Sequence, residues 1–439
     1  MVEKKSMIAA AQRAALCAAQ AEFGKERVYV AGEHEKHQFG FNVPSLALRY
    51  LIGMTTWPLQ RITQSQGPQY SCKSAFIFQL ERWVLEAGGV VFHVDTENKV
   101  SSSLQAAMIP ERFLIDPEYS LMYQQATLQS INEWQRFVTQ QLVNMKDTAK
   151  QFSGKKDAKP DYMMFIAVDS MLGSGSEESS KYIQKQGEAQ GRTFSDASLL
   201  IANYMRDMPT KLIGWPVNVH FSHHEKDDPS ARFGGKRHGG GSAPDFMATL
   251  DLVFSLGRKK PSDSYADSGG PAFTTVYDGK TMRPGVQGRW VTIGIKKNSE
   301  GPAIKRQISV PFVWRYDKIE EEPTNPDAVV ESEGAQYKQV AWWDWDTACV
   351  DMCLNHATQL KDVLKIERKT GSRETVYYCE AAGVSPEDAM LQHELGAVIE
   401  SNEKLSRDIV AALHLNRTRV FYPDIWDEIN PKTRRTKKS

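Results

Sequence analysis

A chain of 439 residues is too long for one small core and predicts two or three domains. Its 41% hydrophobic and 25% charged residues are the composition of an ordinary globular protein. Basic and acidic side chains number 54 each, so net charge neither supports nor excludes a nucleic-acid partner, which would have to bind at local patches.

The five cysteines argue against both a disulfide framework and a zinc motif. Their number is odd and their positions show no paired metal-ligand spacing, so we expect a reducing, intracellular setting. The N-terminus has no basic segment followed by an apolar run, and no stretch approaches the roughly 18 apolar residues that span a bilayer. The sequence therefore predicts a cytoplasmic protein without a membrane partner.

The first 42 residues are expected to form an arm without a core of its own. Residues 5–23 are rich in alanine, with larger apolar residues on one side, and predict a helix that ends near Gly24. The short run "RVYV" that follows is typical of a strand. One helix and one strand bury little apolar surface, so the arm should lie against its own domain or against another copy of the chain.

Residues 43–317 alternate apolar strand patterns with helical stretches, which predicts an α/β core with a largely parallel sheet. Later apolar runs separated by turn-rich residues favour an antiparallel extension of that sheet. Two polar, glycine-rich segments, 173–193 and 225–245, predict long loops. The expected strands cover residues 61–66, 88–97, 162–170, 216–224, 246–258, 289–298 and 303–316.

The remaining chain predicts a linker, a small domain and a tail. Residues 318–336 are acidic and turn-prone, as in a linker, and 337–430 predict a mainly helical C-terminal domain. Within it, "SPEDAMLQHELGAVI" predicts a helix capped by Ser385 with Pro386 in its first turn. The aromatic run "AWWDWD" could stack on bases but more often anchors a core. The basic residues 431–439 predict a disordered tail, which could gather DNA by charge or bind nothing.

The segment "QGPQYSCKSAF" is similar to a phosphate-binding loop, G-x-x-x-x-G-K-[ST], with Cys72 at the second glycine position. A strand pattern precedes it and a helical pattern follows it, as such a loop requires. Backbone N–H groups at a helix N-terminus can wrap a phosphate, Lys73 would neutralise its charge, and the Ser74 hydroxyl would bind Mg²⁺. Alternatively, Cys72 is a small core residue and Lys73 a solvated lysine at a helix start.

Acidic residues follow two other strand patterns, at the edge where parallel strands end. "VVFHVDTE" presents Asp95 and Glu97, and "MMFIAVDS" presents Asp169. Nucleotide hydrolysis needs a carboxylate near the Mg²⁺ and often another that orients water. An acid after a strand is also commonly only a helix cap, but together with the loop these residues predict a nucleotide-hydrolysing core.

In this order the motifs resemble RecA-type recombinases, including their phage-encoded relatives. The resemblance covers roughly Val43 to Trp314 and runs through "VPSLALRYLIGMTTWPLQRITQSQGPQYSCKSAF", "VVFHVDTE", "FIAVDSMLG", "VNVHFSHHEKDD", "GGGSAPDFMATLDLVFSLGR" and "GIKKNSEGPAIKRQISVPF". It implies a RecA-like P-loop ATPase core with an N-terminal helix-strand arm and a small C-terminal domain.

The resemblance also implies roles for individual residues. Glu97 would polarise the attacking water, and Asp169 and Ser74 would serve Mg²⁺. The family carries an Asn-Gln pair that senses the γ-phosphate, where this chain has Ser222 and His223, so His223 is the candidate sensor; the alternative is a polar strand end without a ligand. The expected ATP-binding residues are Gly67, Pro68, Gln69, Tyr70, Ser71, Cys72, Lys73, Ser74 and His223, with Lys296 and Lys297 reaching a neighbouring protomer's phosphates.

The two polar loops occupy the positions of the family's DNA-contacting loops. Basic residues among glycines suit sequence-tolerant contact with a phosphate backbone, although without the family either segment would be read as a solvated loop. The candidate DNA-binding residues are Lys181, Lys185 and Arg192 in the first loop, and Arg232, Lys236, Arg237 and His238 in the second.

The expected function is a DNA-dependent ATPase that uses ATP and Mg²⁺, with Lys73 and Glu97 as its catalytic residues. It would form helical filaments on single-stranded DNA, pair that DNA with a duplex, and serve recombination or repair in a bacterial or phage-infected cell. Single-strand-binding or mediator proteins are further expected partners. The alternatives are a RecA-fold ring ATPase or helicase, and an accessory filament protein that does not hydrolyse ATP.

Overall fold

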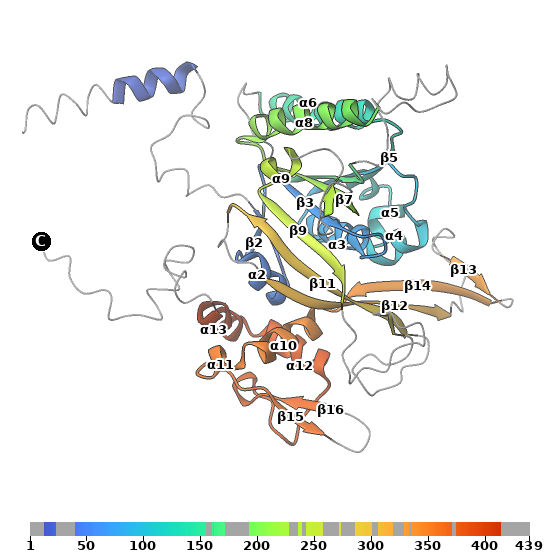
Figure 1. Ribbon diagram of the computed structural model, residues 1–439, viewed down its shortest axis with the longest axis vertical. Coiled ribbons are helices and arrows are strands. Elements are labelled where there is room, and N and C mark those ends of the chain that lie inside the picture. The colour runs from blue at the N-terminus through green and yellow to red at the C-terminus, as the bar shows by residue number, and fades with distance from the viewer. Residues whose placement is uncertain are drawn as a thin grey trace, which may run out of the picture.

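A mixed β-sheet of twelve strands forms the centre of the computed structural model (Figure 1). Six strands on one side run parallel, and the strands beyond β9 continue the sheet in antiparallel fashion. The α/β class predicted from the sequence is therefore confirmed. Residues described by the structure are 13–22, 40–154, 160, 162–171, 193–227, 236–238, 243–257, 272–273, 286–300, 306–318, 329–332, 335–370 and 375–413.

The strand order brings together segments that are far apart in the chain. β8 (Lys236–His238) pairs with β7, and β10 (Ala272–Phe273) pairs with β11. All seven predicted strands are present. Across the sheet the order is β13 (Val329–Ser332), β14 (Ala335–Trp343), β12 (Gln307–Lys318), β11 (Val286–Asn298), β9 (Leu250–Leu256), β3 (Arg61–Gly67), β7 (Val217–Asp227), β6 (Met164–Asp169), β4 (Val90–Asp95) and β5 (Tyr123–Thr127).

Helices cover both faces of the parallel strands and bury one apolar cluster on each. Along β6, Phe165 and Ala167 belong to one cluster, and Ile166 and Val168 belong to the other, because successive side chains of a strand point to opposite faces. The elements around the sheet are β1 (Gly40–Asn42), α2 (Leu46–Ile52), β2 (Thr56–Pro58), α3 (Lys73–Glu86), α4 (Ser102–Met108), α5 (Arg112–Ile115), η2 (Ser120–Met122), α6 (Ile131–Ser153), α8 (Thr193–Leu212) and α9 (Ala243–Met247).

Of the expected N-terminal arm, residues 13–22 form a helix that lies apart from the sheet in Figure 1. Most of its side chains are exposed, as expected of an arm without its own core. The predicted strand "RVYV" lies outside the described residues. Within the described part of the chain, no helix has the length and apolar character needed to cross a bilayer.

The range expected to be a linker contributes to the sheet instead. β12 extends to Lys318, β13 lies within residues 318–336, and β14 begins at Ala335. β14 leads directly into the C-terminal helices, so the sheet and the C-terminal unit are joined by a strand. That unit comprises α10 (Trp345–Asn355), α11 (Ala357–Leu360), β15 (Glu367–Thr370), β16 (Thr375–Tyr378), η4 (Glu380–Ala382), α12 (Gln392–Ser401) and α13 (Glu403–Leu413).

The helix predicted to begin at Ser385 begins seven residues later, at Gln392. Ser385 instead closes a turn, in which its hydroxyl oxygen accepts from the backbone N–H of Asp388 at 3.3 Å. Met390 exchanges two backbone hydrogen bonds with Tyr377, at 2.8 and 3.0 Å, and this isolated β-bridge keeps Met390 itself out of a helix. The cap signal was local, and a tertiary strand pairing overrode it.

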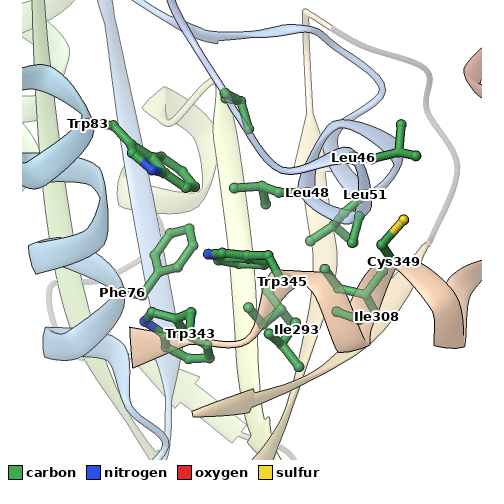
Figure 2. Packing of buried hydrophobic residues seen from close by; sticks show 14 of the residues in the cluster. Leu46, Leu48, Leu51, Phe76, Trp83, Ile293, Ile308, Trp343, Trp345 and Cys349 are labelled. Atoms are coloured by element: carbon green, nitrogen blue, oxygen red, sulfur yellow. The ribbon is translucent and has the colours of Figure 1, made fainter. Parts of the chain in front are cut away.

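The aromatic run "AWWDWD" packs against the sheet domain rather than facing solvent (Figure 2). Trp343 and Trp345 are 3% and 9% exposed and contact Phe76 of α3, with ring centroids 6.1 and 6.5 Å away. Trp343 Nε1 also donates to the backbone oxygen of Ala75 at 3.1 Å. These side chains form a core, as the sequence favoured, and that core couples the C-terminal unit to α3.

Asp344, between the two tryptophans, is a buried N-cap of α10. Its carboxylate accepts from the backbone N–H and the hydroxyl of Thr347, at 2.9 and 2.6 Å. Burial nevertheless raises the pKa of Asp344 to about 7. Since the folded state binds this proton more tightly than the unfolded chain does, the free energy of unfolding should fall as pH rises from the ordinary aspartate range towards 7.

We therefore expect wild type to exceed Asp344→Asn in free energy of unfolding by less and less as pH rises, because only wild type carries the Asp344 carboxyl. The difference in the free energy of unfolding should change by at most about 1.4 kcal/mol per pH unit in that window, the limit for one proton. Urea denaturation at several pH values measures it. Asp388→Asn, at an exposed aspartate of the same unit, is the control. A pH-independent difference would show that Asp344 is charged throughout.

Candidate functional site

A pocket of about 670 Å³ lies where the parallel strands β3, β4, β6 and β7 end. The register pairs Asp95 with Asp169, and Gly67 with His224, so residues from four separate chain segments meet at one sheet edge. Residues lining the pocket are Gln69, Tyr70, Ser71, Cys72, Lys73, Ser74, Ala75, Phe78, Asp95, Glu97, Lys99, Val100, Ser101, Ser103, Leu104, Asp169, His224, Arg289, Phe312, Trp314 and Gln339.

The predicted phosphate loop connects β3 to α3 and forms one wall of this pocket. Gly67 has φ +155°, and a Cβ there would lie 2.2 Å from the backbone oxygen of Phe254, so only glycine fits. No side chain caps α3, which leaves its first backbone N–H groups available to an anion. Lys73 is 5% exposed, and its Nζ donates to the backbone oxygens of Gly67 and Pro68 at 2.9 and 2.7 Å.

Cys72 adopts the backbone conformation that the missing glycine would favour. Its φ and ψ are +62° and +26°, in the left-handed region, and Tyr70 is left-handed as well with φ +63°. Such a conformation costs a residue with a side chain about 1–2 kcal/mol. Burial raises the pKa of the Cys72 thiol to about 12, even though Arg289 and Lys73 lie nearby. The side chain is therefore a neutral thiol in a strained loop.

Cys72→Gly should relieve this strain and stabilise the folded protein by up to about 1 kcal/mol, after the greater flexibility of unfolded glycine is counted. Cys72→Ala removes the thiol but keeps the strain, so it is the matched control and should bring no such gain. Thermal denaturation of both variants measures the difference. Equal stability of the two would mean that the left-handed backbone at Cys72 carries no cost.

The two aspartates at the strand ends have different surroundings. The Asp95 carboxylate accepts from the backbone N–H groups of Glu97 and Val100, both at 3.0 Å, which is the capping role left open by the sequence. Asp169 accepts a hydrogen bond from the Ser222 hydroxyl. Both carboxylates line the pocket. The Asp95 carboxylate holds its own turn, whereas among the described residues the Asp169 carboxylate accepts from the Ser222 hydroxyl.

Glu97 is surrounded by three hydrogen-bonding side chains. Its Oε1 accepts from the Ser170 hydroxyl at 2.6 Å and lies 3.0 Å from His224 Nε2, and its Oε2 accepts from Lys99 Nζ at 2.8 Å. The bond to His224, followed by those to Lys99 and Ser170, holds the pKa of Glu97 well below its usual range despite partial burial. Glu97 is thus an ionised carboxylate facing the pocket.

The histidines at the end of β7 occupy different environments. His223, the sensor candidate, is 1% exposed and is not among the residues that line the pocket; its neighbour His224 lines it and contacts Glu97. His220 is fully buried, which lowers its pKa to about 3, and its ring contacts the hydroxyls of Thr63 and Ser65 at 2.9 and 3.2 Å. His220 is therefore a neutral core residue.

Lys296 and Lys297, expected to reach a neighbour's phosphates, lie on β11 and contact α9 of their own chain. Lys296 Nζ donates to the Asp245 carboxylate at 2.9 Å. Lys297 Nζ donates to the backbone oxygens of Asp245 and Phe246, at 3.0 and 2.6 Å. Neither lysine lines the pocket, so any contact with another protomer's nucleotide would require them to leave these partners.

Most candidate DNA-binding residues fall on parts of the chain that the structure does not describe. Lys181, Lys185, Arg192 and Arg232 lie outside the described residues. Lys236, Arg237 and His238 form β8, which pairs antiparallel with residues 225–227 at the end of β7. The second predicted loop therefore continues directly from the strand that carries His224.

Sequence reasoning missed His224, Ser170, Lys99 and Arg289 as pocket residues. His224 is adjacent to His223, the sensor candidate. Ser170 and Lys99 are each within two residues of a predicted acid, so the sequence motifs pointed to the segments that contain all three. Arg289 carried no such signal, because it comes from β11, more than 200 residues after the loop it contacts. Only the sheet order brings it to the pocket.

No family model and no curated protein matches this chain. The site is therefore interpreted from its own geometry and chemistry.

Proposed function

We propose that this chain is a RecA-like P-loop ATPase that binds ATP and Mg²⁺ in the pocket at the sheet edge, and whose hydrolysis depends on DNA. The observation that carries the proposal is the convergence of Lys73, Glu97 and Asp169 on one pocket, next to the uncapped N-terminus of α3. A cation, an ionised carboxylate and a helix N-terminus without a side-chain cap are groups that phosphoryl transfer uses.

The donor set fits Mg²⁺ held jointly by protein and phosphate. Among the described residues, no three His, Cys, Asp or Glu side chains converge to form a metal cage. Mg²⁺ in nucleotide sites needs only one or two protein ligands, since phosphate oxygens and waters complete its octahedron. Ser74 and Asp169, which both line the pocket, would supply the protein's share.

Each side chain has a defined task in this proposal. Bound Mg²⁺-ATP supplies the electrophilic phosphoryl group and part of the charge neutralisation. Lys73 would exchange its loop carbonyls for phosphate oxygens and neutralise them. Glu97 would orient the attacking water; its lowered pKa makes it a weak proton acceptor, so orientation is its larger contribution. His224 and Lys99 would have to loosen their hold on Glu97 for this.

DNA dependence is proposed from the connection between β7 and the second polar loop. β7 carries His224 at the pocket and continues without a break into the pairing with β8. Binding of single-stranded DNA to the basic loop residues would therefore act on the strand that contacts Glu97. We assign the γ-phosphate response to the end of β7, at His223 or His224, rather than to His223 alone.

In this proposal the chain assembles as a helical filament on single-stranded DNA and pairs it with duplex DNA, in recombination or repair. The exposed helix over residues 13–22 supports assembly, because such a helix needs a neighbour to cover its apolar side. Single-strand-binding or mediator proteins would be the accessory partners.

The test is ATP hydrolysis by the full chain with and without single-stranded DNA, together with electron microscopy in a non-hydrolysable ATP analogue. The proposal predicts DNA-stimulated hydrolysis and filaments. Closed rings would favour the helicase-type alternative, and filaments without hydrolysis would favour the accessory protein. Absence of both hydrolysis and nucleotide binding would falsify the proposal.

A further inference from the structure

Arg289 lies on β11, in the antiparallel part of the sheet, yet it reaches the phosphate loop. Its Nη1 donates to the backbone oxygen of Tyr70 at 2.8 Å, and its guanidinium carbon lies 5.7 Å from the centre of the Trp314 ring. Arg289, Trp314 and Lys73 all line the same pocket. The pocket therefore holds a cation from the antiparallel part of the sheet in addition to Lys73 and Lys99.

The guanidinium retains donor capacity that the described chain does not use. Arg289 Nε is buried and has no hydrogen-bond partner among the described residues. A buried donor without an acceptor is costly, so its presence beside a phosphate loop points to an acceptor supplied by a ligand. The planar fork of an arginine matches the oxygens of a phosphate, with two parallel N–H···O bonds.

The positive charge of Arg289 acts on Cys72, the residue just before α3. Burial dominates the pKa of the Cys72 thiol and raises it to about 12, but the nearby charge of Arg289, and then that of Lys73, opposes this rise. Both cations are thus close to the helix start where an anion would bind. Tyr70, whose backbone oxygen accepts from Arg289, is 79% exposed. The tip of the loop at Tyr70 is therefore open to solvent.

The lysines expected to serve as cations from a neighbouring protomer are occupied elsewhere. Lys296 and Lys297 contact α9 of their own chain and do not line this pocket. The pocket's own cations are Lys73, Lys99 and Arg289, and Lys99 is paired with Glu97. Arg289 is therefore placed to neutralise phosphate without help from another copy.

We propose that Arg289 contacts the phosphate chain of the bound nucleoside triphosphate from within the same protomer, so that the unassembled chain binds the nucleotide before any filament forms. This inference rests on the proposed nucleotide site. It assigns phosphate binding to a residue of β11, and it means that nucleotide affinity does not depend on filament assembly.

The test is calorimetric titration of AMP-PNP with Mg²⁺ into the full chain without DNA, at a concentration where sedimentation shows a monomer. Arg289→Ala should lower the affinity about 10- to 100-fold, as expected for loss of charge-assisted hydrogen bonds. Arg289→Lys keeps the charge but not the fork, and should lose less. The loss should be smaller for AMP, which offers one phosphate, than for the triphosphate analogue.

Arg315→Ala is the matched control. Arg315 is an exposed arginine on neighbouring β12, 5.8 Å from the Trp342 ring, and does not line the pocket. It should leave affinity unchanged, and thermal denaturation checks that every variant is folded.

The outcomes separate this inference from the proposed function. If the monomeric wild type binds AMP-PNP and Arg289→Ala binds equally well, the role of Arg289 is wrong while the nucleotide site stands. Binding that appears only when the protein assembles would overturn the within-protomer assignment. If the wild type does not bind in either state, the nucleotide site itself is wrong, and the inference falls with it.

Discussion

Glu97→Gln is expected to lower ATP turnover by about 100-fold or more while leaving ATP affinity nearly unchanged. The carboxylate faces the pocket and is held ionised by His224, Lys99 and Ser170. Glutamine keeps the shape but replaces one oxygen by an N–H₂ donor, so it no longer orients or polarises a water as an anion does. Removal of a negative charge near phosphate should, if anything, favour binding.

Steady-state hydrolysis with single-stranded DNA and calorimetric binding of an ATP analogue measure the two halves of this prediction. Glu86→Gln is the matched control, because Glu86 lies at the far end of α3 and pairs with Arg82 outside the pocket. It should leave turnover unchanged. Undiminished turnover in Glu97→Gln would remove Glu97 from the reaction and favour another acid of the pocket, Asp95 or Asp169.

Glu81→Ala is expected to lower the free energy of unfolding by about 3–5 kcal/mol, the range for breaking a buried charged pair by removing one partner. Glu81 of α3 and His93 of β4 are both fully buried, with 2.7 Å between Oε1 and Nδ1. Burial raises the pKa of Glu81, and contact with Glu81 raises the pKa of His93 although burial alone would lower it. The pair therefore holds one proton, whichever partner carries it. Without Glu81, the imidazole loses that acceptor inside the core.

This pair also positions the site. Glu81 lies two turns after Lys73 on the same helix, and His93 lies two residues before Asp95 on its strand. The Tyr123 hydroxyl of β5 donates a second hydrogen bond to Glu81, at Oε2 and 3.2 Å. Loss of the pair should therefore reduce turnover beyond what the loss of folded protein explains, because the loop and the acids are no longer held at a fixed spacing.

Urea denaturation of Glu81→Ala, His93→Ala and the double variant Glu81→Leu/His93→Phe tests this reasoning. The apolar double variant should be more stable than either single variant, since neither partner is left buried alone. In the double variant Glu81→Ala/His93→Ala, a loss equal to the sum of the two single losses would contradict a specific pair and point to cavity formation at two independent sites.

Hydrophobic pattern predicted the central strands well. Each of the seven strands expected in the α/β core is present, because a continuous apolar run flanked by turn residues, such as the one that forms β6, is buried on both faces in any sheet it joins. The position of the loop between β3 and α3 was also predicted, because its signals are local: Gly67 at the end of a strand, and Lys73 at the start of a helix. The left-handed backbone at Cys72 was not predicted, and phosphate binding by the loop stays a prediction.

Elements whose state depends on distant partners were predicted less well. The residues called a linker became β13 and part of β14, because β12 offered an open strand edge. The helix start at Ser385 was displaced to Gln392, because Met390 pairs with Tyr377. In both cases a local preference of about 1 kcal/mol or less competes with several tertiary hydrogen bonds.

The sequence by itself determined the α/β class, the parallel strands and the identity of the loop, lysine and acids that end them. Tertiary structure alone decided that His224 contacts Glu97, that Lys296 and Lys297 turn to α9, and that Arg289 reaches the loop from β11. The reason is physical. Burial and backbone conformation depend mainly on a few neighbouring residues, whereas contacts between charged side chains across a sheet depend on strand order, which no local pattern specifies.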